Sequence, residues 1–193
     1  MSIEEIKTPK DILDFMNEHI KYGWLDISNE IHWGNMENFR RLYRTASIDE
    51  CLKNGLGICI EQVYLMHLLF DKLGIKNKMF CTRIYEDENF NDLNAHEHMH
   101  CFVLYYLDGQ VIQLEHPNVD RINFYYYSNE EEAVADINKY YIDMSGGIPR
   151  PVTEFFDVKP NLSFKEFNCY INSLGEYDFT MECNIKKEKE KVI

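Results

Sequence analysis

The spacing of apolar residues predicts helices over much of the first part of the chain. Residues 9–20 begin with a proline and place apolar side chains at helical spacing. Residues 37–53 predict one or two short helices, because "SIDE" at 47–50 matches a capping box. The stretch between them, "KYGWLDISNEIHWGN", has no clear period, and we expect it to be irregular and rich in turns.

The strongest helical pattern follows the glycine-containing break "KNGLG" at 53–57. Apolar residues recur there at positions 59, 63, 66, 70 and 73, and leucines fill much of the remaining circumference. A helix that is apolar nearly all round packs in the interior, so we expect this helix to be central. Gly74 is placed to end it as the glycine that follows a last helical turn.

The next part of the chain alternates between apolar and polar residues as strands do. Residues 76–86 predict one strand, and His98–Leu107 and Gln110–Glu115 predict two more. Asp-Gly between two apolar runs is a strong hairpin signal, so the last two strands are expected to pair around it.

The rest of the chain adds helices. "SNEEEAVADINKYYID" predicts a helix with Ser128 as its N-cap and acidic residues in its first turn. "GGIPRP" predicts a turn, residues 160–175 another helix, and residues 176–185 a last strand. This order of elements predicts an α+β domain with an antiparallel sheet.

Length and charge narrow the classes of protein that fit. A chain of 193 residues without repeats or a low-complexity linker predicts one domain over 1–193, with a charged tail at 186–193 that frays. The net charge of −13 argues against nucleic acid and anionic membranes as partners. We see no leader peptide and no apolar run long enough to span a membrane, so we expect a soluble, cytoplasmic protein.

The cysteines do not predict a disulfide framework or a structural zinc site. There are six of them, irregularly spaced and without a C-x-x-C pair, and most are expected to be small core residues. Cys59 differs, because it follows the glycine-containing break and opens the central helix. The helix dipole and the free backbone N–H groups there favour a thiolate and could hold an oxyanion. An ordinary buried cysteine is the alternative.

The hairpin geometry selects one histidine of "NAHEHMHCF" (94–102). If Asp108 and Gly109 form the turn, Leu107 faces Gln110, and His100 and Glu115 become diagonal neighbours on one face of the sheet. An imidazole and a carboxylate can meet at that separation, so the two predict a base and the residue that orients it. A buried structural pair is the alternative, and an error of one residue in the turn would reverse the faces.

A metal site is the other interpretation of this histidine cluster. His96, His98 and His100 share one face of an extended strand, and His116 or Glu97 could add ligands. Three such rings span about 13 Å along a strand, too far to reach one ion without a bulge. We therefore expect no specific metal site, and His19, His32 and His67 are expected to be structural.

Two stretches carry a resemblance to a known family. "GLGICIEQVYLMHLLFDKLGIKNKMF" resembles the nucleophile helix of the transglutaminase-like cysteine superfamily, and "HCFVLYYLDGQVIQLEHP" resembles its second and third motifs. The resemblance is close over 55–117. It implies a papain-like fold, with N-terminal helices and a central nucleophile helix packed on an antiparallel sheet. It also implies Cys59 as nucleophile, His100 as general base and acid, and Glu115 as the orienting acid.

The chain is most similar to small stand-alone bacterial members of that superfamily. The resemblance implies a core over about 10–145, followed by an addition over 146–185. The usual orienting acid is Asp, whereas this chain has Glu, and Cys101 precedes the aromatic Phe102 after the histidine. The side chain that completes the oxyanion hole is left open among Tyr22, Trp24 and Trp33.

The resemblance implies an enzyme that attacks an amide or acyl carbonyl of a peptide or small molecule, as a peptidase, amidase or acyltransferase, without a cofactor. Two alternatives stay open. One is a non-catalytic binding domain on the same fold, and the other, less favoured, is a metal-binding protein that uses the histidine cluster. The residues do not indicate an oligomeric state.

Overall fold

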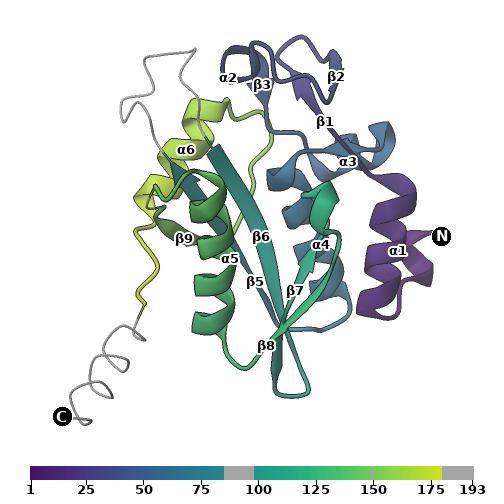
Figure 1. Ribbon diagram of the computed structural model, residues 1–193. Coiled ribbons are helices and arrows are strands. Elements are labelled where there is room, and N and C mark those ends of the chain that lie inside the picture. Colours follow the sequence, from purple (N-terminus) through teal and green to yellow (C-terminus); the bar gives the residue numbers. More distant parts are fainter. Residues whose placement is uncertain (85–97, 149, 180–193) are drawn as a thin grey trace.

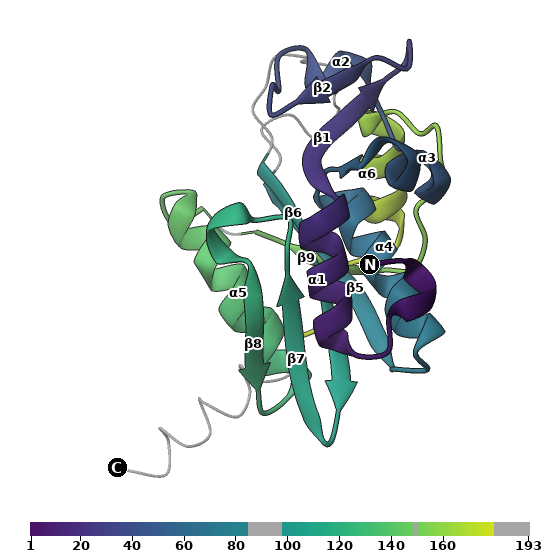
Figure 2. The same ribbon diagram turned by 90° about the vertical axis from the view of Figure 1, so that its right-hand side faces the viewer.

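The computed structural model describes residues 1–84, 98–148 and 150–179, and it has helices on both faces of an antiparallel sheet (Figure 1). A smaller sheet lies beyond one end of the larger one, near the N-terminal part of the chain (Figure 2). The predicted α+β class is therefore confirmed. Among the described residues, no helix combines the length and the apolar character that crossing a membrane requires.

The larger sheet has five strands in the order β8-β7-β6-β5-β9, and every neighbouring pair is antiparallel. Its strands are β5 (Asn77–Ile84), β6 (His98–Leu107), β7 (Gln110–Glu115), β8 (Asn123–Tyr127) and β9 (Val152–Phe155). The predicted hairpin is confirmed, because Leu107 pairs with Gln110 and the pairing continues to Val103 and Leu114. The two edge strands, β8 and β9, were not predicted.

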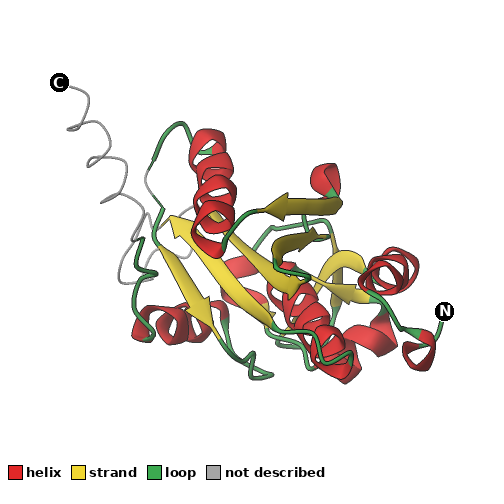
Figure 3. Ribbon diagram, turned by 90° about the horizontal axis from the view of Figure 1, so that it is seen from below, coloured by secondary structure: helices red, strands yellow, loops and turns green. Residues whose placement is uncertain are grey.

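Each face of this sheet carries its own apolar core. On β6, Cys101, Val103 and Tyr105 belong to the core that α4 (Cys59–Lys72) completes. Phe102 and Leu104 belong to a second core with α5 (Glu130–Met144). Successive side chains of a strand point to opposite faces, so the alternation along β6 places one helix on each side of the sheet (Figure 3).

The N-terminal part of the chain corrects one prediction. Residues 21–35 are not irregular: β1 (Lys21–Asp26) and β2 (Ile31–Trp33) form an antiparallel hairpin. The Asp26 carboxylate stabilises the turn between them, because its Oδ1 accepts backbone N–H groups at 2.7 and 2.9 Å. The other elements here are η1 (Ile3–Glu5), α1 (Pro9–His19), α2 (Phe39–Leu42), β3 (Tyr43–Arg44), α3 (Ile48–Asn54) and β4 (Leu56–Gly57).

The predicted helices near the N-terminus and the centre are confirmed, with their signals. In α3, Ser47 accepts the backbone N–H of Glu50 and the Glu50 side chain returns to Ser47, as the capping box requires. Gly74 follows α4 with a φ of +68°, a left-handed conformation that glycine adopts without strain.

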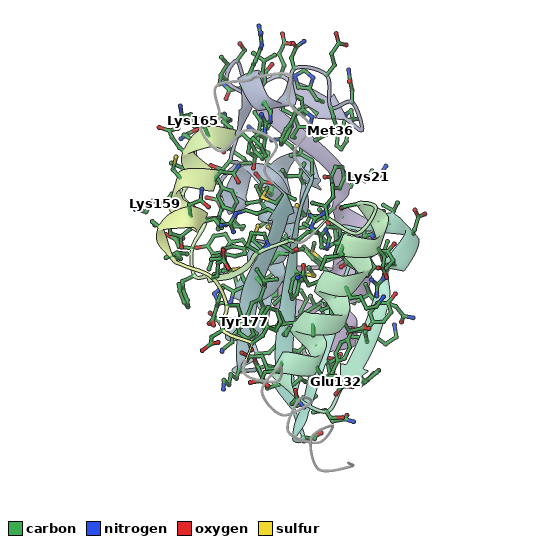
Figure 4. The ribbon with its side chains drawn as sticks, turned by 60° about the vertical axis from the view of Figure 1, so that its left-hand side comes forward. Lys21, Met36, Glu132, Lys159, Lys165 and Tyr177 are labelled. Atoms are coloured by element: carbon green, nitrogen blue, oxygen red, sulfur yellow. The ribbon has the colours of Figure 1, made fainter. Side chains whose placement is uncertain are left out.

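The C-terminal part contains η2 (Val119–Arg121), α5 and α6 (Phe164–Ser173). Asn129, and not Ser128, caps α5, because its side chain accepts the backbone N–H of Glu132 at 2.8 Å. Residues 176–179 are not a strand, and the remainder of the predicted last strand lies outside the described residues. Figure 4 labels Glu132 on α5 and Lys165 on α6, which lie on opposite sides of the molecule.

The predicted division of the chain into a core, an addition and a tail stays a prediction. The 146–185 segment supplies β9 as an edge strand, and Phe155 and Phe167 belong to the same apolar core as α4. The tail at 186–193 lies outside the described residues.

Candidate active site

Cys59 is the first residue of α4, and the start of this helix is held by its own side chains. Ile58 has no side-chain acceptor, so the Glu61 carboxylate caps the helix by accepting the Ile58 backbone N–H at 3.1 Å. Gly57 leaves room for this turn, because a Cβ there would lie 3.1 Å from Cβ of Glu61. The N-cap of α4 is therefore fixed at Ile58, and Cys59 follows it as the first helical residue.

Glu61 also connects this end of the helix to the segment around β3. It is buried, and its Oε1 accepts the Tyr43 hydroxyl at 2.5 Å and the Ala46 backbone N–H at 3.2 Å. Burial raises the pKa of this carboxyl to about 7, although three donors favour its ionised form.

Gln62 forms a second connection, toward the sheet. Its Nε2 donates to the Gly57 carbonyl at 2.7 Å, and its Oε1 accepts from Nδ1 of His116 at 2.6 Å. Burial lowers the pKa of His116 to about 4, so this imidazole is neutral at pH 7. His116 directly follows β7, and the start of α4 is thus tied to the end of that strand.

The contact between His100 and Glu115 that the hairpin register predicts is present. Nε2 of His100 lies 2.9 Å from Oε2 of Glu115, and both side chains are buried. β6 extends beyond its last pair with β7, Val103 with Leu114, and His100 lies on that extension. The two strands part there, at the place where α4 begins.

Three neighbours hold this pair in position. Gln113 donates to Oε2 of Glu115 at 2.8 Å, and the Asn118 backbone N–H donates to Oε1 at 3.0 Å. The ring of Tyr141, from α5, stacks on the His100 imidazole with centroids 4.3 Å apart. Sequence reasoning did not include these residues, although Gln113 lies two positions before Glu115 and therefore on the same face of β7.

The charges of Cys59 and His100 support each other. A hydrogen bond from Cys101 is the largest cause of a lowered pKa at Cys59, burial opposes it, and the charge of His100 lowers it further. Burial alone would lower the pKa of His100, but the Glu115 carboxylate and Cys59 raise it. These directions favour the charged form of each side chain over its neutral form.

Cys101 is a neighbour that sequence reasoning did not find. It was expected to be an ordinary strand cysteine, but it lowers the pKa of Cys59 and shares an apolar core with it. No local pattern indicates this influence, because it depends on how α4 docks on β6. Its place directly after His100 was the available hint.

The three candidates for the oxyanion hole have different surroundings. Tyr22 pairs with Gly57 between β1 and β4, and the charge of Cys59, after burial, raises the pKa of its phenol. The Trp24 indole N–H already donates a hydrogen bond to the Asn35 carbonyl at 2.8 Å. The Trp33 side chain is 51% exposed, and its ring lies against Gly23. Tyr22 is therefore the candidate whose phenol the charge of Cys59 influences.

The histidine cluster is described only in part. His96 and Glu97 lie outside the described residues, and His98 is placed only as the first residue of β6. A different group, Asp26, Glu30 and His32, has ligand atoms within 4.8 Å of one another, although Oδ1 of Asp26 already accepts two backbone N–H groups. Nε2 of His32, a residue expected to be structural, donates to Oδ2 of Asp26 at 3.0 Å.

Comparisons with known proteins give distant likenesses among solved structures. No protein-family model matches the chain, and no curated protein matches it. Among solved structures, the chain is similar to an arylamine N-acetyltransferase from Bacillus cereus, with a TM-score of 0.36 and 13% sequence identity. The match covers 57% of this chain and 42% of that chain, and that protein has a Cys-His-Glu catalytic triad. Membership of the transglutaminase-like superfamily stays a prediction.

Proposed function

We propose that the protein is a transglutaminase-like cysteine enzyme that attacks an amide or related acyl carbonyl, with Cys59, His100 and Glu115 as its triad. One observation carries the proposal: a cysteine begins a buried helix, and its pKa is lowered in part by the charge of a histidine that a buried carboxylate contacts at 2.9 Å.

In the proposed reaction, the Cys59 thiolate attacks the carbonyl carbon and forms a tetrahedral intermediate. Free backbone N–H groups at the start of α4 and the Tyr22 hydroxyl stabilise its oxyanion. His100 then protonates the leaving group, and Glu115 stabilises the imidazolium. Because Nε2 of His100 faces Glu115, Nδ1 is the atom that exchanges protons with the thiol and the leaving group.

The acyl-enzyme that remains is released to water or to an amine. His100, now neutral, accepts a proton from the incoming nucleophile, and the thiolate is regenerated. The same residues serve a peptidase, an amidase or an acyltransferase, since the acceptor alone distinguishes these reactions.

The test compares two buried cysteines within one molecule. Cys59 is 3% exposed and Cys51 is 1% exposed, but burial and the charge of Glu61 raise the pKa of Cys51. We expect iodoacetamide at pH 7 to alkylate Cys59 much faster than Cys51, as read by peptide mass spectrometry. Replacing the exposed Cys169, and Cys183 outside the described residues, by serine removes competing thiols.

Activity is then screened with a p-nitrophenyl ester, a thioester and a glutaminyl peptide, each with and without a primary amine. Cys59→Ala is expected to abolish both hydrolysis and amine incorporation. Fast labelling at another cysteine, or turnover that survives in Cys59→Ala, would contradict the catalytic assignment.

The burial of the thiol favours a second candidate function. Cys59 is 3% exposed and His100 7%, as expected for a binding domain whose triad is retained without catalysis. In that case Cys59 and Cys51 should be alkylated at similar slow rates, and no acyl donor of the screen should be consumed. The same labelling experiment therefore separates the two functions.

A further inference from the structure

Residues 159–163, which lead from β9 into α6, are bound to Thr45 through every polar group of that residue. The Thr45 hydroxyl donates to the Lys159 carbonyl at 2.6 Å and accepts the Leu162 backbone N–H at 2.8 Å. The Thr45 backbone N–H donates to the Leu162 carbonyl, and its own carbonyl accepts the Asn161 backbone N–H, both at 2.8 Å. Thr45 is 0% exposed, so these four bonds satisfy its polar groups away from water.

Residues 43–46 are also bound to the start of α4. The Tyr43 hydroxyl and the Ala46 backbone N–H donate to Oε1 of Glu61 at 2.5 and 3.2 Å. Oε2 of the same carboxylate accepts the backbone N–H of Ile58, the N-cap residue of α4, at 3.1 Å. The segment 43–46 therefore connects the turn before α6 to the residue directly before the candidate nucleophile.

Further contacts hold the two ends of this connection together. Arg44 forms an antiparallel bridge with Ser163, the N-cap residue of α6. Phe164, the first residue of α6, packs edge-on against Phe39 and Tyr43, with ring centroids 5.1 and 6.2 Å apart. These residues are more than 100 positions apart in the chain, so no local pattern of the sequence indicates that they meet.

The connection acts on the first turn of α4 and not on the helix as a whole. The apolar core already holds the body of the helix against the sheet, and apolar packing has little directional preference. Buried hydrogen bonds are directional, and a fully satisfied network fixes one arrangement of the groups that it joins. A catalytic group needs that precision, because a misplacement of about 1 Å can cost about 100-fold in rate.

We propose that Thr45 and Glu61 are positioning residues for Cys59, through which residues 159–163 hold the first turn of α4 in the orientation that the reaction needs. The inference deepens the proposed function and rests on it, because it concerns the same Cys59 thiol. It gives a part in the candidate active site to a segment that supplies no residue of the proposed triad.

Two variants of the full chain open the connection at its two ends. Thr45→Val keeps the shape of the side chain and removes the hydroxyl that joins Lys159 to Leu162. Glu61→Gln turns one carboxylate oxygen into an NH2 group, so at least one of the three donors to Glu61 loses its acceptor.

Three further variants make the comparison specific. Thr45→Ser restores the hydroxyl and tests for rescue. Thr153→Val is the matched control, because it also removes the hydroxyl of a threonine that is 0% exposed, one that accepts from Nη1 of Arg83 at 2.9 Å. Tyr43→Phe removes one donor to Glu61, and it takes the place of Glu61→Gln if circular dichroism shows that the latter does not fold.

The measurement is the rate of Cys59 alkylation by iodoacetamide from about pH 5 to pH 9, beside urea unfolding of each variant. Thr45→Val and Glu61→Gln should slow alkylation at pH 7 about tenfold, with recovery at higher pH, because a displaced first turn stabilises the thiolate less. Loss of a negative charge two residues from the thiol would by itself favour the thiolate, so a slower rate in Glu61→Gln reports position.

The controls should behave differently. Thr45→Ser and Thr153→Val should stay within about threefold of the wild-type rate, although Thr153→Val loses stability much as Thr45→Val does. For an acyl donor that the wild type turns over, kcat should fall in Thr45→Val and Glu61→Gln while KM changes little.

Each other result has a defined meaning. If Thr45→Val and Glu61→Gln keep the wild-type pH profile, or if Thr153→Val slows alkylation as much as Thr45→Val, the positioning inference is wrong and the proposed function stands. Faster alkylation in Glu61→Gln would also overturn the inference, because charge and not position would then govern the thiol. If wild-type Cys59 is alkylated no faster than Cys51, the proposed function fails and the inference fails with it.

Discussion

Two buried histidines lie just beyond the last pair of β6 with β7, and their pKa values are shifted in opposite directions. His100 is 7% exposed and faces the Glu115 carboxylate, whereas His116 is 5% exposed and faces the neutral Gln62 amide. The pKa of His100 is raised, and burial lowers that of His116 to about 4. Burial alone makes a histidine neutral, and one buried carboxylate reverses the outcome. The opposite pKa shifts of these two histidines thus arise from a difference in partner.

The largest expected effect is a reversal of the pKa shift at His116. In the wild type, a folded pKa of about 4 lies below the unfolded value, so His116 contributes stability above about pH 6.5 that is lost as the pH falls toward 4. Gln62→Glu places a carboxylate beside the ring and should raise this pKa above its unfolded value. The contribution is then present at low pH and lost as the pH rises through the raised pKa.

The change is worth about 3 kcal/mol, since each pKa unit corresponds to about 1.4 kcal/mol. NMR titration of the His116 ring and urea unfolding across the pH range measure it. The substitution also removes the donor to the Gly57 carbonyl, a loss that lowers stability at every pH and is therefore separable. An unchanged titration of His116 would show that its partner does not control its charge.

The next effect concerns the reactivity of Cys59. His100→Gln removes the cation that stabilises the thiolate, and the alkylation rate of Cys59 at pH 7 should fall about 100-fold. His116→Gln is the matched control at the neutral site and should cause a much smaller loss. Equal losses in the two variants would mean that the charge of His100 does not set the reactivity.

A smaller effect should follow when His100, like His116, is given a neutral amide as its partner. Glu115→Gln retains a hydrogen-bond acceptor for His100 but removes the negative charge, so the pKa of His100 should fall. The rate of Cys59 alkylation, followed from about pH 5 to pH 9, should fall roughly tenfold at neutral pH and recover at higher pH. A pH profile identical to that of the wild type would contradict the role assigned to Glu115.

The smallest expected effect is that of Tyr141→Phe. The ring that stacks on His100 is retained, and only the hydrogen bond from Asn118 to the tyrosine hydroxyl, 3.2 Å long, is lost. We expect a loss of stability of about 1 kcal/mol and an alkylation rate of Cys59 within about threefold of the wild type. Tyr141→Ala, which removes the ring, is the comparison, and it should slow alkylation more.

The parts of the fold that local signals define were predictable. The Asp-Gly turn determined the register of β6 and β7, and with it the contact of His100 with Glu115. The glycine-containing break and the apolar period located the start of α4 close to Cys59. In each case residues near one another in the chain decide the structure.

The parts that depend on distant contacts were not predictable. In the hairpin of β1 and β2, the last four residues of β1 are all buried and β2 is short and half-exposed, so neither strand alternates clearly, and β8 presents a similar difficulty. The influence of Cys101 on the pKa of Cys59 arises from docking of α4 on the sheet, and Gln62 reaches His116 in the same way. Periodicity carries no information about either contact.

The parting of β6 and β7 also bears on how the chain folds. His100 and Glu115 are 15 residues apart and close within one hairpin, so their pair requires only a short loop to close. Cys59 is separated from both by α4 and β5, and it joins them only when the helix docks. The lowered pKa of Cys59 is therefore a property of the completed domain, and a nascent or partly unfolded chain carries an ordinary cysteine at that position. A lowered pKa at Cys59 thus reports native docking of α4.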